Sequence, residues 1–489
     1  MHSTSTMHSH LLRPRPLAAA FAAILTCSAQ LALALQTSPL PPASQSPRVQ
    51  VVSNCNDSGA GSLRDAVTNA IDGETIDLTQ LSCSFITLST GAILIGAQDL
   101  TLDGPGADLL NINSAGYAGN GVIYDLAGGT LKIDGVSVAF GSKYRSDANT
   151  HGGCIYSAGN VMLTDTHVYA CTTRSVNAYD SKGGAVYAQG DVSLIDSVVN
   201  LCGVTVESGS GQGGGVFAGG NLTMGYSTIS GCRIATATAG VGGGAYVAGD
   251  LFMKYSTVSD NLIDEATVSD GGGLHTAGDV DILWSTISGN NAVTGGGLSM
   301  TGGNYGHTAQ IRESTISGNT AQSAGGVKAW LPLELFSSTI AFNTIPRHYS
   351  IPLDYAFSAG LALLGSPVRI ESSIIANNVA FGDVDDPEDI GGELSLTFDG
   401  SNNLIQSSAQ PTPPDTIAED PRLASLADNG GLTATHALFS GSPALDRGNN
   451  LGNFSTDQRG VGFARELNNR ADIGAYESDA DLIFSNGFD

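Results

Sequence analysis

A repeat of fixed period constrains the fold of this chain more than any other feature of its sequence. The string Ser-Thr-Ile/Val-Ser-x-Cys/Asn recurs at equal spacing in the middle of the chain, where it starts at Ser227, Ser256, Ser285 and Ser314. Thr166 and Ser197 extend the series upstream at slightly longer spacings, and Ser338 and Ser373 continue it less regularly. A fixed period in the range of about 20–50 residues is typical of a solenoid, in which each unit buries its apolar face only against its neighbours.

Aligning the repeats sorts their residues into columns. An apolar column follows the glycines of each repeat, and alternation along a strand assigns it to the core: Ile155, Val186, Val216, Ala245, Leu274 and Leu298. Another column begins with three cysteines and continues as asparagine: Asn261, Asn290, Asn319, Asn343 and Asn378. Stacked Asn amides can hydrogen-bond from turn to turn, as in the side-chain ladders of in-register strands.

Three short strands per turn with such a ladder predict an all-β fold, a right-handed parallel β-helix solenoid. A leucine-rich repeat needs a shorter period, and the strands of a propeller blade are antiparallel. Right-handed winding follows from the crossover rule for parallel strands. We expect residues 91–405 to form the solenoid, residues 51–90 an N-terminal cap with a short helix starting at Ser62 before a first strand Thr75 to Leu78, and residues 406–478 an irregular C-terminal cap.

An outward-facing column of mostly aromatic residues is the best binding candidate on the strands. It consists of Tyr156, Tyr187, Phe217, Tyr246 and His275. Flat rings in a row can stack on sugar faces, or they can stack on one another and stabilise the solenoid by about 0.5 to 1.5 kcal/mol per pair. Loops of uneven length follow the Cys/Asn column and project from the same side of the solenoid. They either bind a ligand or have drifted in sequence because the fold tolerates changes there. These loops are 172–182, 203–212, 233–241, 262–270, 291–294 and 344–359.

Six cysteines follow the N-terminal segment. Cys55 and Cys83 flank the first ordered segment and are expected to pair. Cys171, Cys202 and Cys232 occupy the same place on consecutive turns, close enough to bridge if their side chains turn toward each other, and we expect Cys154 to be the fourth participant. No paired Cys-x-x-Cys spacing points to a metal.

The segment 1–34 has the pattern of an export signal. Basic Arg13 and Arg15 precede an apolar run from Leu17 to Leu35, and Ala32-Leu33-Ala34 is a small-residue cleavage site. A Pro/Ser-rich leader follows at 35–50. No later apolar run reaches the roughly 20 residues that a membrane-spanning helix needs. We therefore expect an exported, monomeric protein without a membrane span in the mature chain.

Two segments resemble regions of exported bacterial β-helix proteins. The string Gly61-Ser62-Leu63-Arg64-Asp65-Ala66-Val67 resembles the CSLREA-type segment, with Gly61 in place of the Cys. The C-terminal region resembles a choice-of-anchor Q region, through the strings at 420–423, 428–433, 441–448, 456–460 and 472–477. The tail at 479–489 is similar to short endings on exported proteins of some Gram-negative bacteria. These resemblances imply export to the outer cell surface, the medium or the periplasm, and no reaction.

The charge balance and the acidic groups exclude some functions and leave others open. With 46 acidic and 20 basic residues, the chain has a net charge of −26 and is not expected to bind nucleic acid. An acidic loop, with Asp383, Asp385, Asp386 and Asp389, either binds calcium or is simply solvated. No other cofactor is expected. In the C-terminal region Arg459, Asp457, Asp472 and Glu477 are interpreted as structural ion pairs.

Catalysis requires side chains that converge. A lyase needs a base near carboxylates that hold calcium, and a glycosidase needs two carboxylates across the bond. Asp281, Glu334 and Arg369 share one outward column but are expected not to converge. We therefore expect a non-enzymatic, adhesin-like protein that contacts glycans or cell-surface partners. The alternative is a polysaccharide lyase or hydrolase, which an Arg or Lys beside two or more carboxylates in a groove would favour.

Overall fold

The computed structural model describes residues 48–116, 119, 121–236, 238–264, 266–302, 306–346, 358–365, 367–380, 389–392, 398–467 and 469–479, within the compact unit Arg48–Asp489. The expected signal peptide (1–34), most of the leader, the tail and three residues of the acidic loop, Asp383, Asp385 and Asp386, lie outside the described residues. No helix in the described ranges is long and apolar enough to cross a membrane.

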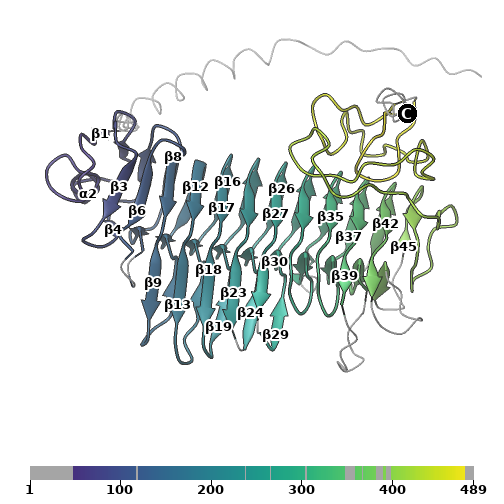
Figure 1. The fold of residues 1–489 in the computed structure, drawn as a ribbon, viewed down its shortest axis with the longest axis horizontal. Helices are drawn as coiled ribbons and strands as arrows, with labels where there is room; N and C mark the ends of the chain where they lie inside the picture. The colour runs from purple at the N-terminus through teal and green to yellow at the C-terminus, as the bar shows by residue number, and fades with distance from the viewer. Residues whose placement is uncertain are drawn as a thin grey trace, which may run out of the picture. The chain divides into compact units, whose positions relative to one another are not determined.

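The predicted parallel β-helix is confirmed by the strand pairing (Figure 1). One strand of each turn lies in an eleven-stranded parallel sheet, sheet B. Its pairings include the predicted core column, with Ile155 opposite Val186 and Val186 opposite Val216. The strands of sheet B are β4 (Ile93–Ile95), β7 (Ile123–Asp125), β11 (Ile155–Ser157), β15 (Val186–Ala188), β20 (Val216–Ala218), β25 (Ala245–Val247), β30 (Leu274–Thr276), β33 (Leu298–Met300), β36 (Val327–Ala329), β40 (Leu361–Leu363) and β44 (Ile390–Gly392).

The other two strands of each turn belong to a 23-stranded sheet, sheet A. Its second strands are β2 (Thr75–Asp77), β5 (Thr101–Asp103), β16 (Val192–Ile195), β21 (Leu222–Gly225), β26 (Leu251–Lys254), β31 (Val280–Leu283), β34 (Ala309–Arg312), β37 (Leu333–Phe336), β41 (Val368–Glu371) and β45 (Phe398–Asp399). Its third strands are β3 (Phe85–Leu88), β6 (Asn111–Ser114), β17 (Val198–Asn200), β22 (Thr228–Ser230), β27 (Thr257–Ser259), β32 (Thr286–Ser288), β35 (Thr315–Ser317), β38 (Thr339–Ala341), β42 (Ile374–Ala376) and β46 (Leu404–Ile405). Two long strands, β8 (Thr130–Ala139) and β12 (Asn160–Tyr169), run through both positions.

The N-terminal end of the solenoid differs in one respect from expectation. Helix α2 (Leu63–Thr68) starts after Ser62, whose hydroxyl accepts a hydrogen bond from the Asp65 N–H. The first strand, however, precedes the helix: β1 (Val49–Val51) lies in parallel with β2. The leader thus ends in a strand, because β-branched Val49 and Val51 favour the extended backbone that pairs with the edge of β2.

The expected loops are largely ordered sheets, which corrects their interpretation as irregular connections. They form two five-stranded parallel side sheets, C and D, beside the middle turns (Figure 1). Apolar residues of sheet C form a separate small core with Ala292. Side sheet C contains β9 (Ser142–Arg145), β13 (Thr172–Ser175), β18 (Gly203–Val206), β23 (Arg233–Thr236) and β28 (Leu262–Asp264), and side sheet D contains β10 (Thr150–His151), β14 (Ser181–Lys182), β19 (Ser210–Gln212), β24 (Ala239–Val241) and β29 (Val268–Asp270). Two later turns pair β39 (Thr344–Ile345) with β43 (Val379–Ala380).

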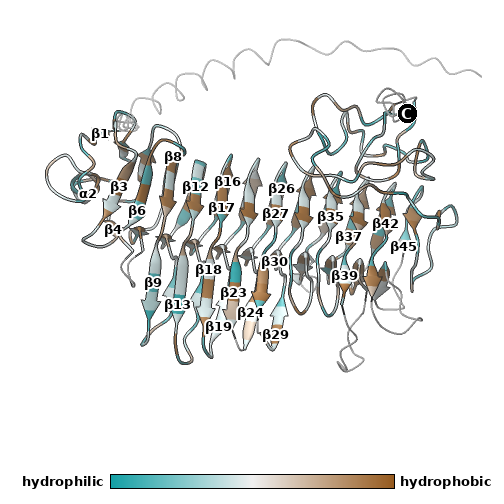
Figure 2. Ribbon diagram, in the orientation of Figure 1, coloured by the Kyte–Doolittle hydropathy of each residue, from teal (hydrophilic) through white to brown (hydrophobic). Residues whose placement is uncertain are grey.

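The core of the solenoid is a continuous column of buried Val, Ile, Leu and Met side chains. Brown, hydrophobic segments recur from strand to strand in Figure 2. Each Ser of the Ser-Thr repeat is buried and forms a second ladder, which the sequence analysis did not identify. The Ser256 hydroxyl, for example, accepts the Ser227 N–H of the previous turn at 3.2 Å and donates to the Lys254 carbonyl at 2.9 Å. The repeat therefore specifies buried polar groups that are satisfied by neighbouring turns.

The C-terminal region (406–478) is more than an end cap. It packs along the outside of sheet A, across the turns from Trp284 to Ser372 (Figure 1). Thr286 donates to the Ala434 carbonyl at 2.7 Å, and Ala475 donates its N–H to Thr339 at 3.1 Å. Since those turns are far apart in sequence from this region, only the tertiary structure places it there.

Candidate functional site

The aromatic column on sheet B is a stack of rings. From Tyr156 to His275, neighbouring ring centroids lie 4.9 to 5.3 Å apart and neighbouring planes differ by 2° to 8°. His151 of side sheet D stacks on Tyr187 at 4.6 Å, and Lys182 lies 4.9 Å above Phe217. Interior members of the column therefore present edges outward, with their faces against one another. Of the two alternatives for these rings, the structure shows that they stack on one another, which occupies the faces of the interior rings.

The cysteines form two disulfides. Cys55 pairs with Cys83, and Cys154 pairs with Cys171. Cys202 and Cys232 are buried free thiols, so no bridge joins neighbours within the cysteine column. In-register side chains on parallel strands point the same way, whereas a disulfide requires two Cβ atoms that turn toward each other. Cys171 finds such a partner in Cys154, which is one residue before β11.

The asparagine column lies inside the solenoid. Each amide from Asn261 to Asn343 donates to the carbonyl oxygen of the next Asn side chain at 2.9 Å. Asn378, the last member, donates to Asp389 at 2.7 Å. Asp389 is buried, and its other carboxylate oxygen accepts from Ser407. Asp389 therefore extends the ladder and is not free to bind calcium, which corrects its place among the candidate ligands.

A depression on the outer face of sheet A brings together side chains that the repeat does not explain. Two cavities of about 360 and about 340 Å³ share Thr308 and Gln310 and so form one continuous depression. Its floor is the outward column of the second strands, in which consecutive residues are paired in register. We call it the strand groove and define it by Phe252, Asp281, Gln310, Glu334, Arg369 and Asp399.

The charged side chains of the strand groove lie closer together than the sequence suggested. Glu334 is directly opposite Arg369, and Arg369 is opposite Asp399 on the next turn. Arg369 also pairs with the buried Glu371 at 3.2 Å. Glu334 and Arg369 are thus direct neighbours in register, whereas Asp281 lies three turns from Arg369. Glu334 and Arg369 are far apart in sequence, but β37 and β41 pair in parallel, so the two residues lie on neighbouring turns.

Some side chains of the strand groove are paired with one another, but others remain available to a ligand. Gln310 donates to Glu334 at 2.9 Å, and Arg312 pairs with Asp281. Arg369 is 41% exposed on its side chain, and its Nε–H has no hydrogen-bond partner among the described residues. Phe252 is exposed, and no described aromatic ring stacks on it. Unlike the aromatic column, the strand groove therefore presents an exposed ring that is not stacked on another described ring and an arginine N–H without a described partner.

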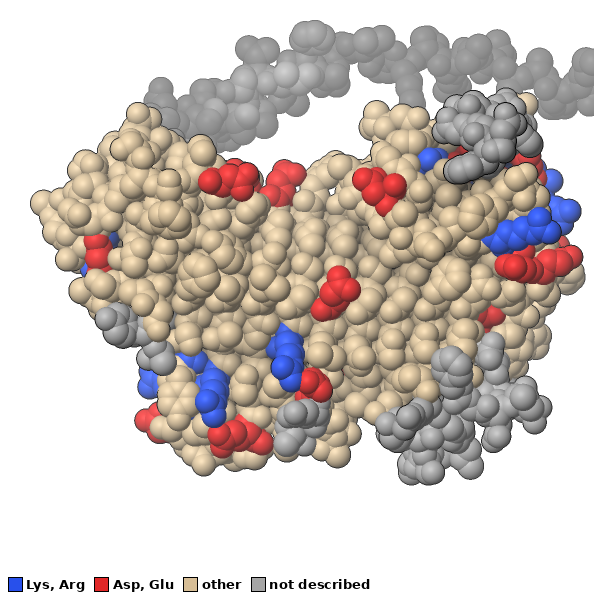
Figure 3. Space-filling model, viewed as in Figure 1, with Lys and Arg blue, Asp and Glu red and all other residues tan. Residues whose placement is uncertain are grey.

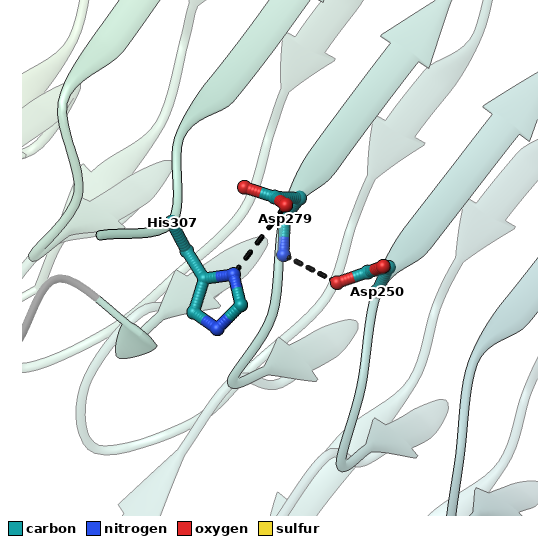
Figure 4. A group of neighbouring side chains, drawn as sticks. All are labelled: Asp250, Asp279 and His307. Atoms are coloured by element: carbon teal, nitrogen blue, oxygen red, sulfur yellow. Dashed lines mark hydrogen bonds and ion pairs between the residues drawn. The ribbon is translucent and has the colours of Figure 1, made fainter. Parts of the chain in front are cut away.

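One edge of the strand groove carries a group that could hold a divalent cation. One ligand atom each from Asp250, Asp279 and His307 lies within 4.8 Å of the other two (Figure 4). The Asp250 carboxylate accepts the Asp279 N–H at 2.8 Å, which fixes its orientation and leaves its second oxygen outward. The Thr308 N–H and the adjacent His307 lower the pKa of Asp279 below its usual range. Two carboxylates with one imidazole suit zinc or manganese, with open positions for a substrate or water.

The ionic residues of the C-terminal region serve to dock that region. Arg459 pairs with Asp457 at 2.7 Å, while Glu477 lies 3.6 Å from Arg465. Arg465 is fully buried and contacts Glu313 of sheet A at 3.1 Å. Asp472 accepts the N–H groups of Asp446 and Ser478. These contacts connect turns and bind the region to the solenoid, and none of them lines the strand groove.

Sequence reasoning placed Asp281, Glu334 and Arg369 in one outward column but missed the other groove residues, because the residues of this column do not repeat. The available signal was the alignment itself: extending the outward column gives Phe252, Asp281, Gln310, Glu334 and Arg369 on consecutive turns. It also missed a second row of stacked rings at the corner between the second and third strands, formed by Tyr226, Tyr255 and Trp284. Elsewhere charged side chains are sparse on the face shown in Figure 3.

The fold and the strand groove define a parallel β-helix solenoid protein with a candidate polymer-binding face. No protein-family model and no curated protein matches the chain. Among solved structures, the chain is similar to a crystal structure of the pectate lyase Pel9A, with 13% sequence identity and a TM-score of 0.39 over 89% of this chain and 97% of that chain. A likeness of this degree carries no conclusion about activity.

Proposed function

We propose that the protein binds an extended polysaccharide along the strand groove. The observation that carries the proposal is the continuous depression over consecutive turns, in which each turn offers one different polar or aromatic side chain. Successive turns are about 4.8 Å apart, close to the length of one sugar unit in an extended chain, so each turn can contact one unit. The carboxylates of Glu334 and Asp399 can accept sugar hydroxyls, and Phe252 can stack on a sugar face.

The charges of the strand groove favour some polysaccharides over others. Asp281 is neutralised by Arg312 and Glu371 by Arg369, but Glu334 and Asp399 have no cationic partner of their own among the described residues. A neutral chain is therefore the preferred ligand. A chain of acidic sugars is repelled unless its carboxylates meet Arg369 or a divalent cation held near Asp250 and Asp279.

The second candidate function is hydrolysis of the bound chain. Glu334 and Asp399 are two turns apart, about 9.6 Å between backbones, just above the range of roughly 6.5–9.5 Å that separates the two carboxyl groups of inverting glycosidases. Arg369 beside Glu334 and Asp399 is the arrangement that we expected to favour an enzyme, but elimination by a lyase also needs a group that can abstract a proton. Arginine is always protonated in proteins, so Arg369, paired with Glu371, cannot serve as the base.

We also propose that this binding occurs outside the cell. The two disulfides support an oxidising compartment, as the amino-terminal sequence pattern does. Attachment to a cell surface is part of the same proposal, and fractionation of cells that express the full chain tests it. Recovery of the chain from the cytoplasm with reduced cysteines would contradict it.

The groove proposal is tested by calorimetric titration of the full chain with neutral and acidic polysaccharides, with and without calcium or zinc. Replacing Arg369 with Gln or Glu334 with Gln should weaken binding about tenfold or more, the value of one hydrogen bond to a charged group. Arg174→Gln is the matched control, because Arg174 is an exposed ion-paired arginine on side sheet C. Equal binding by all variants would rule out the strand groove.

The same samples separate binding from cleavage. Hydrolysis releases reducing ends, and elimination produces unsaturated sugars with ultraviolet absorbance. Reducing ends that disappear in both Glu334→Gln and Asp399→Asn would establish the hydrolase. Tight binding with no product over days would establish the binding protein.

A further inference from the structure

A second cavity lies beside sheet B, where the side sheets end. Strands β28 and β29 are the last of these sheets, and the next turns cross by short connections, with Asp270 bridged to Thr294 and Thr294 to Ser323. Between the last side-sheet strands and these short connections lies a cavity of about 320 Å³. We call it the step pocket and define it by Val268, Asp270, Val293, Thr294, Gln322 and Lys328.

The step pocket contains a pre-paired set of charged groups. Lys328 donates from Nζ to Asp270 Oδ1 at 3.2 Å and to Thr294 at 3.4 Å, and Thr294 donates to the same Asp270 oxygen at 2.7 Å. Only 17% of the Asp270 side chain and 13% of the Lys328 side chain is exposed. Because each charge already has its partner, the pocket has no net charge to attract a free ion.

Asp270 is held in its charged form. Burial would raise the pKa of its carboxyl, but contact with His275 and the charge of Lys328 outweigh burial and hold that pKa well below its usual range. His275 Nδ1 lies 3.5 Å from Asp270 Oδ2. The carboxylate is therefore an acceptor at any pH near neutrality.

Several polar atoms around the step pocket retain unused hydrogen-bonding capacity. Two of the three Lys328 protons are engaged by Asp270 and Thr294, and Asp270 Oδ2 faces only His275 among the described residues. Ser299 lies in register between His275 and Lys328. It is fully buried, and its hydroxyl has no hydrogen-bond partner in the described part of the chain. Buried polar atoms without partners are rare in native proteins, which indicates a missing partner.

We propose that the step pocket binds a single sugar unit, at a chain end or branch. Two adjacent hydroxyls fit the Asp270–Lys328 pair, one donating to Asp270 Oδ2 and the other accepting from Lys328 Nζ. Gln322 offers an amide to a third hydroxyl, and Val268 and Val293 contact the apolar face of the ring. Val268 is 65% exposed, which leaves the ring an entrance.

Sugar is favoured over other occupants by the chemistry of the walls. A phosphate or carboxylate would meet Asp270 as well as Lys328, and an apolar ligand would cover Asp270 Oδ2 and the third Lys328 proton without offering either a hydrogen bond. The inference does not depend on the strand groove, because none of the residues that define the two sites is shared.

Saturation-transfer NMR of the full chain with a panel of methyl glycosides, neutral, acidic and N-acetylated, tests this site. At least one glycoside should show transfer, and Lys328→Gln should weaken its binding about tenfold or more. Gln322→Leu should weaken it about threefold. Its side chain makes no hydrogen bond to the part of the chain that the structure describes, so this variant is expected to fold normally.

The groove variant Arg369→Gln is the control for location and should leave glycoside binding unchanged. The proposal is overturned if no glycoside in the panel shows transfer, or if inorganic phosphate binds and no glycoside does. It is also overturned if Lys328→Gln and Gln322→Leu, both folded, bind as the natural chain does. Loss of binding in Arg369→Gln alone would assign the sugar to the strand groove and leave the step pocket without a ligand.

Discussion

The aromatic column on sheet B and the strand groove on sheet A are both built from one outward residue per turn, but they differ in what satisfies those residues. In the aromatic column the residue type repeats, and each ring covers the faces of its neighbours. In the strand groove the residue changes at almost every turn, and Phe252 and Arg369 keep uncovered surfaces. When the residue type repeats, the side chains of a column satisfy one another. When it changes from turn to turn, some side chains keep exposed surface or unpaired polar atoms that can contact another molecule.

The corner between the second and third strands of sheet A shows the same contrast within one column. Tyr226, Tyr255 and Trp284 repeat an aromatic residue and stack at 5.3 and 4.8 Å. The next position is Glu313, whose partner is Arg465 of the C-terminal region. At this corner, the residue that breaks the repeat binds a distant segment of the same chain. In the strand groove, the residues that break the repeat are proposed to bind the ligand.

The largest expected loss of stability comes from replacing Arg465, the ion-pair partner of Glu313. Arg465→Met should destabilise docking of the C-terminal region by about 3–5 kcal/mol, because it leaves the carboxylates of Glu313 and Glu477 buried without their cation. Hydrogen exchange of residues 419–478 measures the loss. The double variant Glu313→Leu with Arg465→Met should recover much of it, since an apolar pair replaces a buried ion pair. A double variant as unstable as the single one would contradict this explanation.

The asparagine ladder should show the next largest effect. Asn290→Leu removes the acceptor for the side-chain and backbone N–H groups of Asn261 and the donor to the Val258 carbonyl, inside the solenoid, while Asn319 keeps only the backbone N–H of residue 290 as a donor. Each unsatisfied group costs about 1–3 kcal/mol, so the free energy of unfolding in urea should fall by at least that amount. Asn56→Leu, at an exposed Asn outside the ladder, is the control and should change stability little.

A pair of aromatic substitutions tests the comparison directly. Tyr187→Leu removes stacking on Tyr156, Phe217 and His151 and should lower stability by about 1.5–4.5 kcal/mol, at about 0.5–1.5 kcal/mol for each pair, with no effect on polysaccharide binding. Phe252→Ala should do the reverse, weakening polysaccharide binding while the melting temperature changes little. Thermal unfolding and calorimetric titration of both variants provide the measurements. Loss of binding in Tyr187→Leu would restore the aromatic column as a ligand site.

The smallest effect is a pH dependence at the end of the asparagine ladder. Burial raises the pKa of Asp389 to about 6, from an ordinary value of 3.8, despite its hydrogen bonds from Asn378 and Ser407. The folded state therefore binds a proton more tightly than the unfolded state, so the free energy of unfolding should fall as pH rises from about 4 to about 6. Asp389→Asn should remove this part of the slope. An unchanged difference between the two proteins across that range would show that Asp389 titrates normally.

Much of the fold was predictable from the sequence because its contacts are periodic. The period placed Ile155, Val186 and Val216 in one buried column, and the pairing of β11, β15 and β20 has that register. Side sheets C and D were less predictable. Their strands follow segments whose lengths differ between turns, so length alone suggested irregular loops. Their order comes from stacking on one another and from their own apolar core.

The candidate sites were the least predictable part. Glu334 and Arg369 are neighbours because β37 and β41 pair in parallel, although the sequence between them is longer than in the regular repeats. Asp270 meets Lys328 because the side sheets end between them and two turns are short. Such contacts occur once, so no repeated pattern in the sequence reveals them.

The sequence by itself determined the parallel β-helix, the identity of its core columns and the residues of its asparagine ladder, because each of these is a contact between one turn and the next. Only the tertiary structure decided that the C-terminal region lies along sheet A, that Arg465 meets Glu313, and that the strand groove and the step pocket exist. The physical reason is that a repeat encodes nearest-neighbour stacking, whereas these features depend on where insertions begin and end along the solenoid.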